Sequence, residues 1–140
     1  MKVHIKRVDN AFHLESTNED GLKVYTDASP GIGGHNKAFR PMQLVLAALG
    51  SCSSIDVIYL LNKQRQALKH LEVEVDGQRA EGEIPAVFTD IHLKYILYGE
   101  LNEKKVERAC RLSMEKLCSV SKMLEQAVKI SWSYEIREQG

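Results

Sequence analysis

The apolar segment from residue 44 to residue 61 constrains this chain more than any other part of it. A helix formed by these residues is apolar on nearly every side, which is typical of a helix that other elements surround. It is also long enough to raise the question of a membrane span. However, it carries Asp56 and the hydroxyls of Ser51, Ser53 and Ser54. A carboxylate and hydroxyls in mid-span favour a buried helix of a soluble protein, so no membrane association is expected.

The helix is expected to begin at Pro41, because proline suits the first helical turn, and to run to about residue 66. Its last turn is polar and partly basic, as the helix dipole favours. The preceding segment, residues 29–36, is rich in glycine without the ending of a phosphate-binding loop, and it is interpreted as a flexible connector.

Apolar and polar residues alternate in several short segments on both sides of this helix. Strands are expected at residues 3–6, 12–14 and 22–24 before the helix, and at 71–76, 90–97 and 128–137 after it. A second helix, capped by Asn102, is expected at residues 103–117, and a short third helix at 119–124. Strands with one apolar face imply antiparallel sheet with helices packed on one side, so the fold class is α+β. No linker divides residues 1–140, which are expected to form a single domain.

One all-apolar helix is more than the sheet of a 140-residue chain covers easily. A second copy that shares the helix would bury the remainder, so a homodimer is expected.

The composition excludes several classes of function. Lysine plus arginine and aspartate plus glutamate balance at 19 each, and no basic block is interleaved with aromatic residues, so nucleic acid is not an expected partner. The first residues alternate as a strand does and do not form a secretory signal, which predicts a cytoplasmic protein. Three cysteines and five scattered histidines match no zinc spacing. Neither a metal nor another cofactor is expected.

The cysteines are either core residues or reactive thiols. Cys52 lies within the apolar helix, with Asp56 one turn further on, and a buried carboxylate there needs a partner. Cys118 lies near the start of the short helix, where backbone N–H groups and Lys122 would favour a thiolate. Cys110 lies on the apolar stripe of the second helix with Val106, which favours a packing role.

Two segments resemble the signatures of a known family. Residues 40–52, Arg-Pro-Met-Gln-Leu-Val-Leu-Ala-Ala-Leu-Gly-Ser-Cys, resemble the first signature of the OsmC/Ohr family of thiol peroxidases, in which a proline and an Ala-Ala pair lead to a cysteine in a long central helix. Residues 118–122, Cys-Ser-Val-Ser-Lys, resemble the second signature, a cysteine motif at a helix end. The order of elements is also similar, so the resemblance spans the chain.

The resemblance implies a mechanism and an assembly. Cys52 would attack a small organic hydroperoxide as the thiolate and become a sulfenic acid, Cys118 would resolve it to a disulfide, and a dithiol reductant would reopen the disulfide. Family members are intertwined homodimers with their sites at the subunit interface.

The sequence also departs from the peroxidase pattern. Peroxidase members carry a glutamate just after the proline, paired with an arginine that activates the cysteine, whereas Met42 and Gln43 follow Pro41 here. The candidates for the arginine are Arg7, beside the first strand turn, and Arg40. The cysteine context is closer to the OsmC-like branch than to the organic hydroperoxide resistance proteins.

Two further hypotheses follow. In the first, the chain is a redox-sensitive protein that binds a small apolar electrophile or ligand near Cys52 without peroxidase turnover. In the second, it is a structural homodimer whose cysteines only pack.

Overall fold

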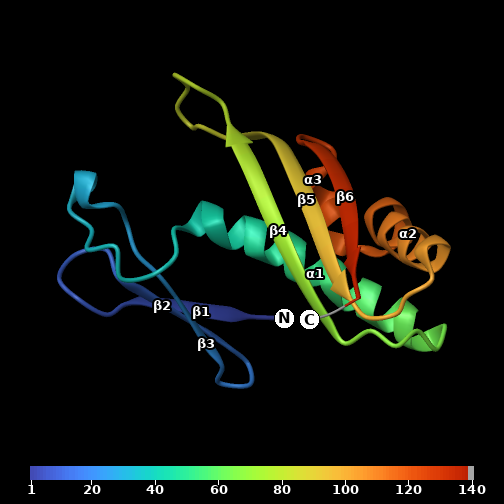
Figure 1. The fold of residues 1–140 in the computed structure, drawn as a ribbon. Coiled ribbons are helices and arrows are strands. Elements are labelled where there is room, and N and C mark those ends of the chain that lie inside the picture. The colour runs from blue at the N-terminus through green and yellow to red at the C-terminus, as the bar shows by residue number, and fades with distance from the viewer. Residues whose placement is uncertain (139–140) are drawn as a thin grey trace. The chain divides into compact units, whose positions relative to one another are not determined.

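The computed structural model describes residues 1–138, and these divide into two compact units, Met1–Val45 and the described residues from Leu46 onward. The order of elements is three strands, a long helix, two strands, two helices and a final strand, as the sequence predicted (Figure 1). The fold is α+β, which confirms the expected class. That residues 1–140 form one domain stays a prediction.

The N-terminal unit is a small antiparallel sheet of β1 (Val3–Arg7), β2 (Leu14–Asn18) and β3 (Lys23–Thr26) in that order. The turn between β2 and β3 is fixed by Asn18, whose side-chain oxygen accepts the N–H groups of Asp20 and Leu22. Gly21 in this turn has φ +81°, a conformation that glycine adopts without strain. A short 3₁₀ turn, η1 (Pro30–Ile32), follows in the glycine-rich segment.

The C-terminal unit contains a sheet of β4 (His70–Arg79), β5 (Phe88–Tyr98) and β6 (Lys129–Arg137). Strands β4 and β5 are antiparallel, but β5 and β6 are parallel, so the expectation of purely antiparallel sheet is wrong here. A parallel pair needs a crossover of a dozen or more residues. The helical segment between Tyr98 and Lys129 supplies it, and alternation within a strand does not reveal the direction of its neighbour.

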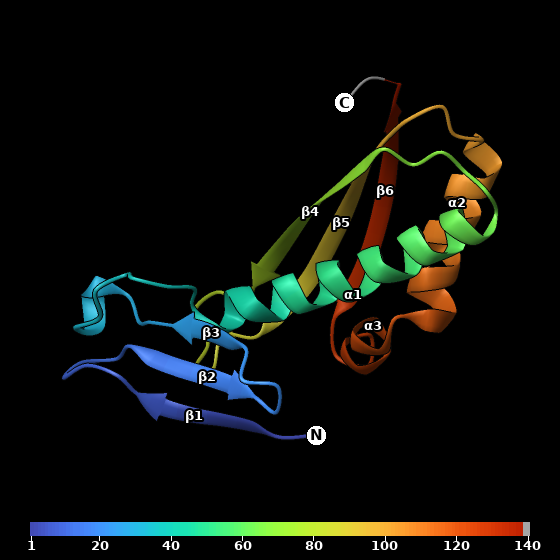
Figure 2. The same ribbon diagram turned by 90° about the horizontal axis from the view of Figure 1, so that it is seen from below.

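Three helices lie on one face of this sheet (Figure 2). They are α1 (Pro41–Lys63), which begins in the N-terminal unit, α2 (Glu103–Leu112) and α3 (Ser119–Leu124). The predicted second helix ends as an α-helix at Leu112, and Ser113–Leu117 continue it as a π-helical turn, η2.

The core of this unit is formed by α1 and the inward face of β5. Leu49, Val57 and Leu61 of α1 are fully buried, as are Leu93 and Leu97 of β5. The strand residues that alternate with the apolar ones of β4 face solvent. The one-sided burial predicted for β4 is confirmed, whereas β5 is buried on both faces at its end, where Ile96 is buried beside Leu97. Strand β1 is exposed along its whole length.

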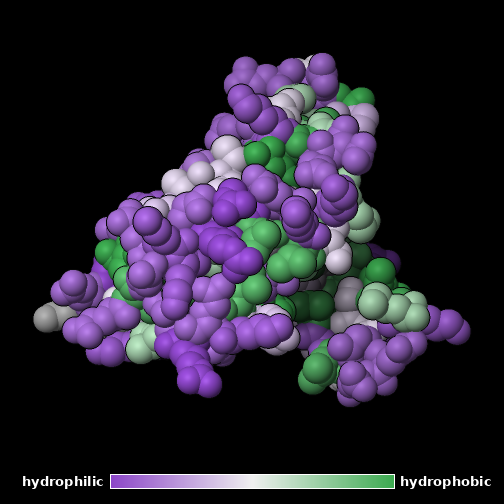
Figure 3. Space-filling model, turned by 90° about the vertical axis from the view of Figure 1, so that its right-hand side faces the viewer, coloured by the Kyte–Doolittle hydropathy of each residue, from purple (hydrophilic) through white to green (hydrophobic). Residues whose placement is uncertain are grey.

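Helix α1 is not surrounded on all sides within one chain, which corrects the expectation that other elements of the chain wrap it. Ile55 and Tyr59 remain 68% and 61% exposed, and Ile58 is exposed as well. By length and composition α1 would also pass as a membrane span, a test that core helices of soluble proteins pass too. On the face drawn in Figure 3, hydrophobic side chains reach the surface between hydrophilic ones.

Candidate functional site

Cys118 lies at the junction between the π-helical turn and α3. Its backbone N–H donates to the carbonyl oxygen of Ser113 at 2.8 Å, which closes the turn. Its sulfur accepts the backbone N–H of Ser121 at 3.4 Å, so the cysteine itself caps α3. The side chain is buried.

The pKa of the Cys118 thiol is raised to about 11. Burial is the main cause, and the side chain of Cys52 raises it further, whereas the backbone N–H groups of Ser121 and Val120 lower it. The segments that carry the two thiols meet in the C-terminal unit, because Ser113, which accepts the N–H of Cys118, bonds to Ser53, the residue next to Cys52. Both are free thiols in the structure.

Cys52 differs from Cys118 in its exposure. It is half-buried on α1, whereas Cys118 and Cys110 are buried. Burial raises the pKa of the Cys110 thiol to about 12, so that thiol stays protonated at neutral pH. Of the three cysteines, Cys52 is the one that a solute reaches most directly.

A polar network joins α1, β5 and the π-helical turn. Ser53 bonds to the hydroxyl of Tyr95 and, at 2.8 Å, to the hydroxyl of Ser113. Ser113 in turn donates to a carboxylate oxygen of Asp56 at 2.9 Å. Burial raises the pKa of the Tyr95 hydroxyl well above its usual range, with Cys110 and Cys118 among the neighbours that add to the shift. Asp56 therefore has the partner that its position in an apolar helix required.

Sequence reasoning missed this network, although one signal was present. Ser113 stood on the apolar stripe of the second predicted helix, where a hydroxyl needs a buried partner. Its partners, Ser53 and Tyr95, come from elements distant in the sequence.

The two candidate arginines both lie in the N-terminal unit and bond locally. Arg7 donates to the carbonyl oxygens of Asn10 and Ala11 in the turn after β1. Arg40 donates to the side chain of Asn36 at 2.6 Å, and its backbone N–H donates to the Gln43 side chain at 2.9 Å. The proposed role of either arginine at the thiolate stays a prediction.

Lys122, expected to favour a Cys118 thiolate, pairs with Glu125 at 3.2 Å. Its charge is thus partly compensated by the residue that follows the short helix.

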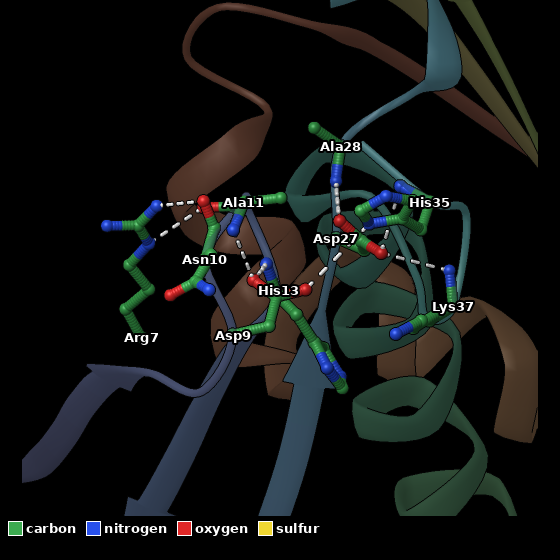
Figure 4. A network of polar contacts seen from close by, with 9 residues as sticks. All are labelled: Arg7, Asp9, Asn10, Ala11, His13, Asp27, Ala28, His35 and Lys37. Atoms are coloured by element: carbon green, nitrogen blue, oxygen red, sulfur yellow. Dashed lines mark hydrogen bonds and ion pairs between the residues drawn. The ribbon is translucent and has the colours of Figure 1, made fainter. Parts of the chain in front are cut away.

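A second polar cluster, also missed from the sequence, organises the glycine-rich segment of the N-terminal unit. The buried carboxylate of Asp27 accepts the backbone N–H groups of Ala28, His35 and Lys37 at 2.7, 3.3 and 3.1 Å (Figure 4). The N–H of Lys37, then those of Ala28 and His35, lower the Asp27 pKa against the effect of burial. The segment predicted to be a flexible connector is therefore held by one side chain.

Among residues 1–138, no three histidine, cysteine, aspartate or glutamate side chains are grouped so as to hold a metal ion. The candidate site consists of two thiols of the C-terminal unit, Cys52 half-buried and Cys118 buried, together with a polar network of Ser53, Tyr95, Ser113 and Asp56.

Comparison with known proteins agrees with this fold. The model of the family described as OsmC-like protein matches residues 34–133. Protein YhfA of Escherichia coli K12 is 41% identical over 97% of this chain and 98% of its own length. A hypothetical protein from Aquifex aeolicus is 33% identical, with a TM-score of 0.80 over 98% of this chain and 97% of its own.

An organic hydroperoxide resistance protein OsmC from Legionella pneumophila shares the fold, with a TM-score of 0.71 at 20% identity over 96% of this chain and 97% of its own. The match of the family model over most of the chain, together with these relatives, shows that the chain belongs to the OsmC family.

Proposed function

We propose that this chain is a two-cysteine thiol peroxidase that reduces small organic hydroperoxides. The observation that carries the proposal is the contact between the segments that bear Cys52 and Cys118: Ser113, whose carbonyl oxygen accepts the N–H of Cys118, bonds to Ser53 next to Cys52. The family's structural neighbours include a protein described as an organic hydroperoxide resistance protein, which supports the substrate class.

The burial of the two thiols supports a division of roles. Cys118 is buried and its pKa is raised to about 11, so it is protonated at neutral pH and a poor first nucleophile. Cys52 is half-buried and accessible to a small solute. Cys52 is therefore the peroxidatic residue and Cys118 the resolving one.

The reaction has three steps. The Cys52 thiolate attacks the distal oxygen of the hydroperoxide, the O–O bond breaks, and the alkoxide leaves and takes a proton to become an alcohol. The Cys118 thiol then attacks the sulfur of the Cys52 sulfenic acid, which forms the disulfide and releases water. A dithiol reductant opens the disulfide by exchange and is itself oxidised to a disulfide.

The test compares three variants in the steady-state consumption of an alkyl hydroperoxide with a dithiol reductant. We expect Cys52→Ser to abolish turnover, and Cys118→Ser, mixed with the hydroperoxide before any dithiol is added, to consume one equivalent and leave a Cys52 sulfenic acid that dimedone traps. Cys110→Ala, which changes a buried thiol outside the proposed pair, is the matched control and should retain turnover. Wild-type turnover in Cys52→Ser would refute the proposal.

A second candidate function is a redox-sensitive protein that binds a small apolar electrophile without turnover. Two observations favour it: the Cys118 pKa is shifted away from activation, and Met42 and Gln43 follow Pro41 in place of a carboxylate. Such a protein would take up one equivalent of electrophile at Cys52, detected by mass spectrometry, while consuming no hydroperoxide. We propose a homodimer for either candidate function.

A further inference from the structure

Ser113 connects the two segments that carry the candidate thiols. Its carbonyl oxygen accepts the backbone N–H of Cys118 at 2.8 Å and so closes the turn that presents the buried thiol. Its hydroxyl bonds at 2.8 Å to that of Ser53, the residue next to Cys52. One residue thus holds the backbone of one cysteine and contacts the neighbour of the other.

Asp56 gives this connection a fixed direction. A carboxylate accepts hydrogen bonds, so the proton of Ser113 points to Asp56 at 2.9 Å. Ser113 then accepts from Ser53, and Ser53 accepts from Tyr95. Each hydroxyl in the chain has a single proton, and the carboxylate at one end determines where all three protons lie.

The network is costly to bury and is fully satisfied. Ser53, Tyr95 and Ser113 are each 0% exposed. Among residues 1–138, no buried side-chain nitrogen or oxygen lacks a hydrogen-bond partner. Apolar side chains would fill the same volume without the desolvation cost, whereas directional bonds specify one geometry. The network therefore fixes how α1 and the π-helical turn meet.

We propose that Ser113 and Asp56 are positioning residues that hold the Cys118 thiol against Cys52 for disulfide formation. The inference rests on the proposed function in one respect, namely that these two cysteines are the redox pair. It does not require that the oxidant be a hydroperoxide.

Holding the segments in place in this way gives the Cys118 thiol a high effective concentration at Cys52. Groups held in reacting geometry react as if at a concentration far above that of free solutes. Without the bond between Ser113 and Asp56, the π-helical turn keeps its backbone hydrogen bond and the contact of Ser113 with Ser53, but it loses the charged acceptor that orients the network. The disulfide then forms less favourably, although both thiols remain.

The experiment equilibrates the full-length protein with mixtures of oxidised and reduced dithiothreitol. The two protein thiols are oxidised to the disulfide as the cyclic disulfide of the reagent is reduced, and mass spectrometry measures the Cys52–Cys118 linkage. The variants are Ser113→Ala and Asp56→Ala, each of which removes one partner, and Asp56→Asn, which keeps an acceptor oxygen. Ser54→Ala is the matched control, because the Ser54 hydroxyl bonds only to the carbonyl of Gly50 in its own helix, at 2.7 Å.

We expect Ser113→Ala and Asp56→Ala to lower the equilibrium constant for the disulfide by about tenfold, the effect of losing roughly one hydrogen bond to a charged group. Asp56→Asn should recover most of the loss, and Ser54→Ala should match the wild type. Asp56 is half-buried, so Asp56→Ala keeps the test valid if Ser113→Ala does not fold. If Asp56 served only the stability of the fold, its substitution would lower the free energy of unfolding, and Asp56→Asn would not restore the equilibrium constant for the disulfide.

A parallel assay of hydroperoxide consumption separates this inference from the proposed function. A disulfide that is weakened in both alanine variants supports the inference even if the wild type consumes no hydroperoxide. An unchanged or raised equilibrium constant in Asp56→Ala overturns it, as does a wild-type chain that forms no Cys52–Cys118 disulfide.

Discussion

At the scale of single residues, burial disfavours charge at two places in this protein, but hydrogen-bond donors reverse the outcome at one of them. In the C-terminal unit it raises the pKa of the Cys110 and Cys118 thiols, which keeps them neutral. In the N-terminal unit the buried Asp27 keeps its charge, because three backbone N–H groups replace the water it has lost. A neutral thiol tolerates an apolar site, whereas a carboxylate needs donors.

Asp27 makes the stability of the protein depend on pH. Its pKa is lowered in the folded state, so its contribution is present above the unfolded pKa of about 4 and is lost as the pH falls through the folded pKa. We expect Asp27→Asn to lower the melting temperature by about 5 °C at pH 7. Below pH 4 the variant should lose less stability than the wild type does.

Thermal unfolding followed by circular dichroism at several pH values measures both effects. Asp20→Asn, in the exposed turn before β3, is the control and should follow the wild-type curve. Parallel pH dependence in Asp27→Asn and the wild type would contradict this account of Asp27.

At the scale of elements, α1 approaches β4 closely at one glycine. A Cβ atom at Gly50 would lie 2.8 Å from Cγ2 of Val75, and that branched side chain has little freedom to move. The close approach is the reason for a glycine in the middle of a helix, where it would otherwise be unfavourable.

Gly50→Ala tests this close approach. Overpacking costs about 1–3 kcal/mol, whereas alanine gains about 1 kcal/mol in helix propensity over glycine. We therefore expect a net loss of about 1 kcal/mol in the free energy of unfolding, measured by urea denaturation. In a Val75→Ala background the clash is absent, and the same substitution should be stabilising. Equal effects in both backgrounds would show that the two residues are not coupled.

At the scale of the whole molecule, the exposed apolar residues of α1 require an explanation. Ile55, Ile58 and Tyr59 are too large and too close together to be left to solvent without cost. A second copy of the chain is the proposed cover, so we expect a homodimer in solution, with twice the mass of one chain by light scattering.

Ile55→Glu places a charge in the middle of this apolar face, and we expect it to yield monomers. Ile84→Glu is the matched control: it makes the same change at an exposed isoleucine of the β4–β5 connection and should leave the dimer intact. A monomeric wild type, or a dimer unaffected by Ile55→Glu, would show that this face serves another purpose.

The sequence by itself determined the elements and their order. Apolar periodicity depends on neighbours a few residues apart, so α1, the one-sided strand β4 and the cap at Asn102 could be predicted. The local contexts of Cys52 and Cys118 were equally accessible, because each lies within a short motif.

Only the tertiary structure decided which distant residues meet. The parallel pairing of β5 with β6, the partners of Asp27 and the contact of Ser113 with Ser53 and Asp56 all join residues that no local period connects. A hydroxyl or carboxylate in an apolar pattern shows that a partner is needed, but its identity depends on how the chain folds back on itself. The chemistry of the two thiols is also decided by the tertiary structure, because they can react with each other only if the fold brings them together.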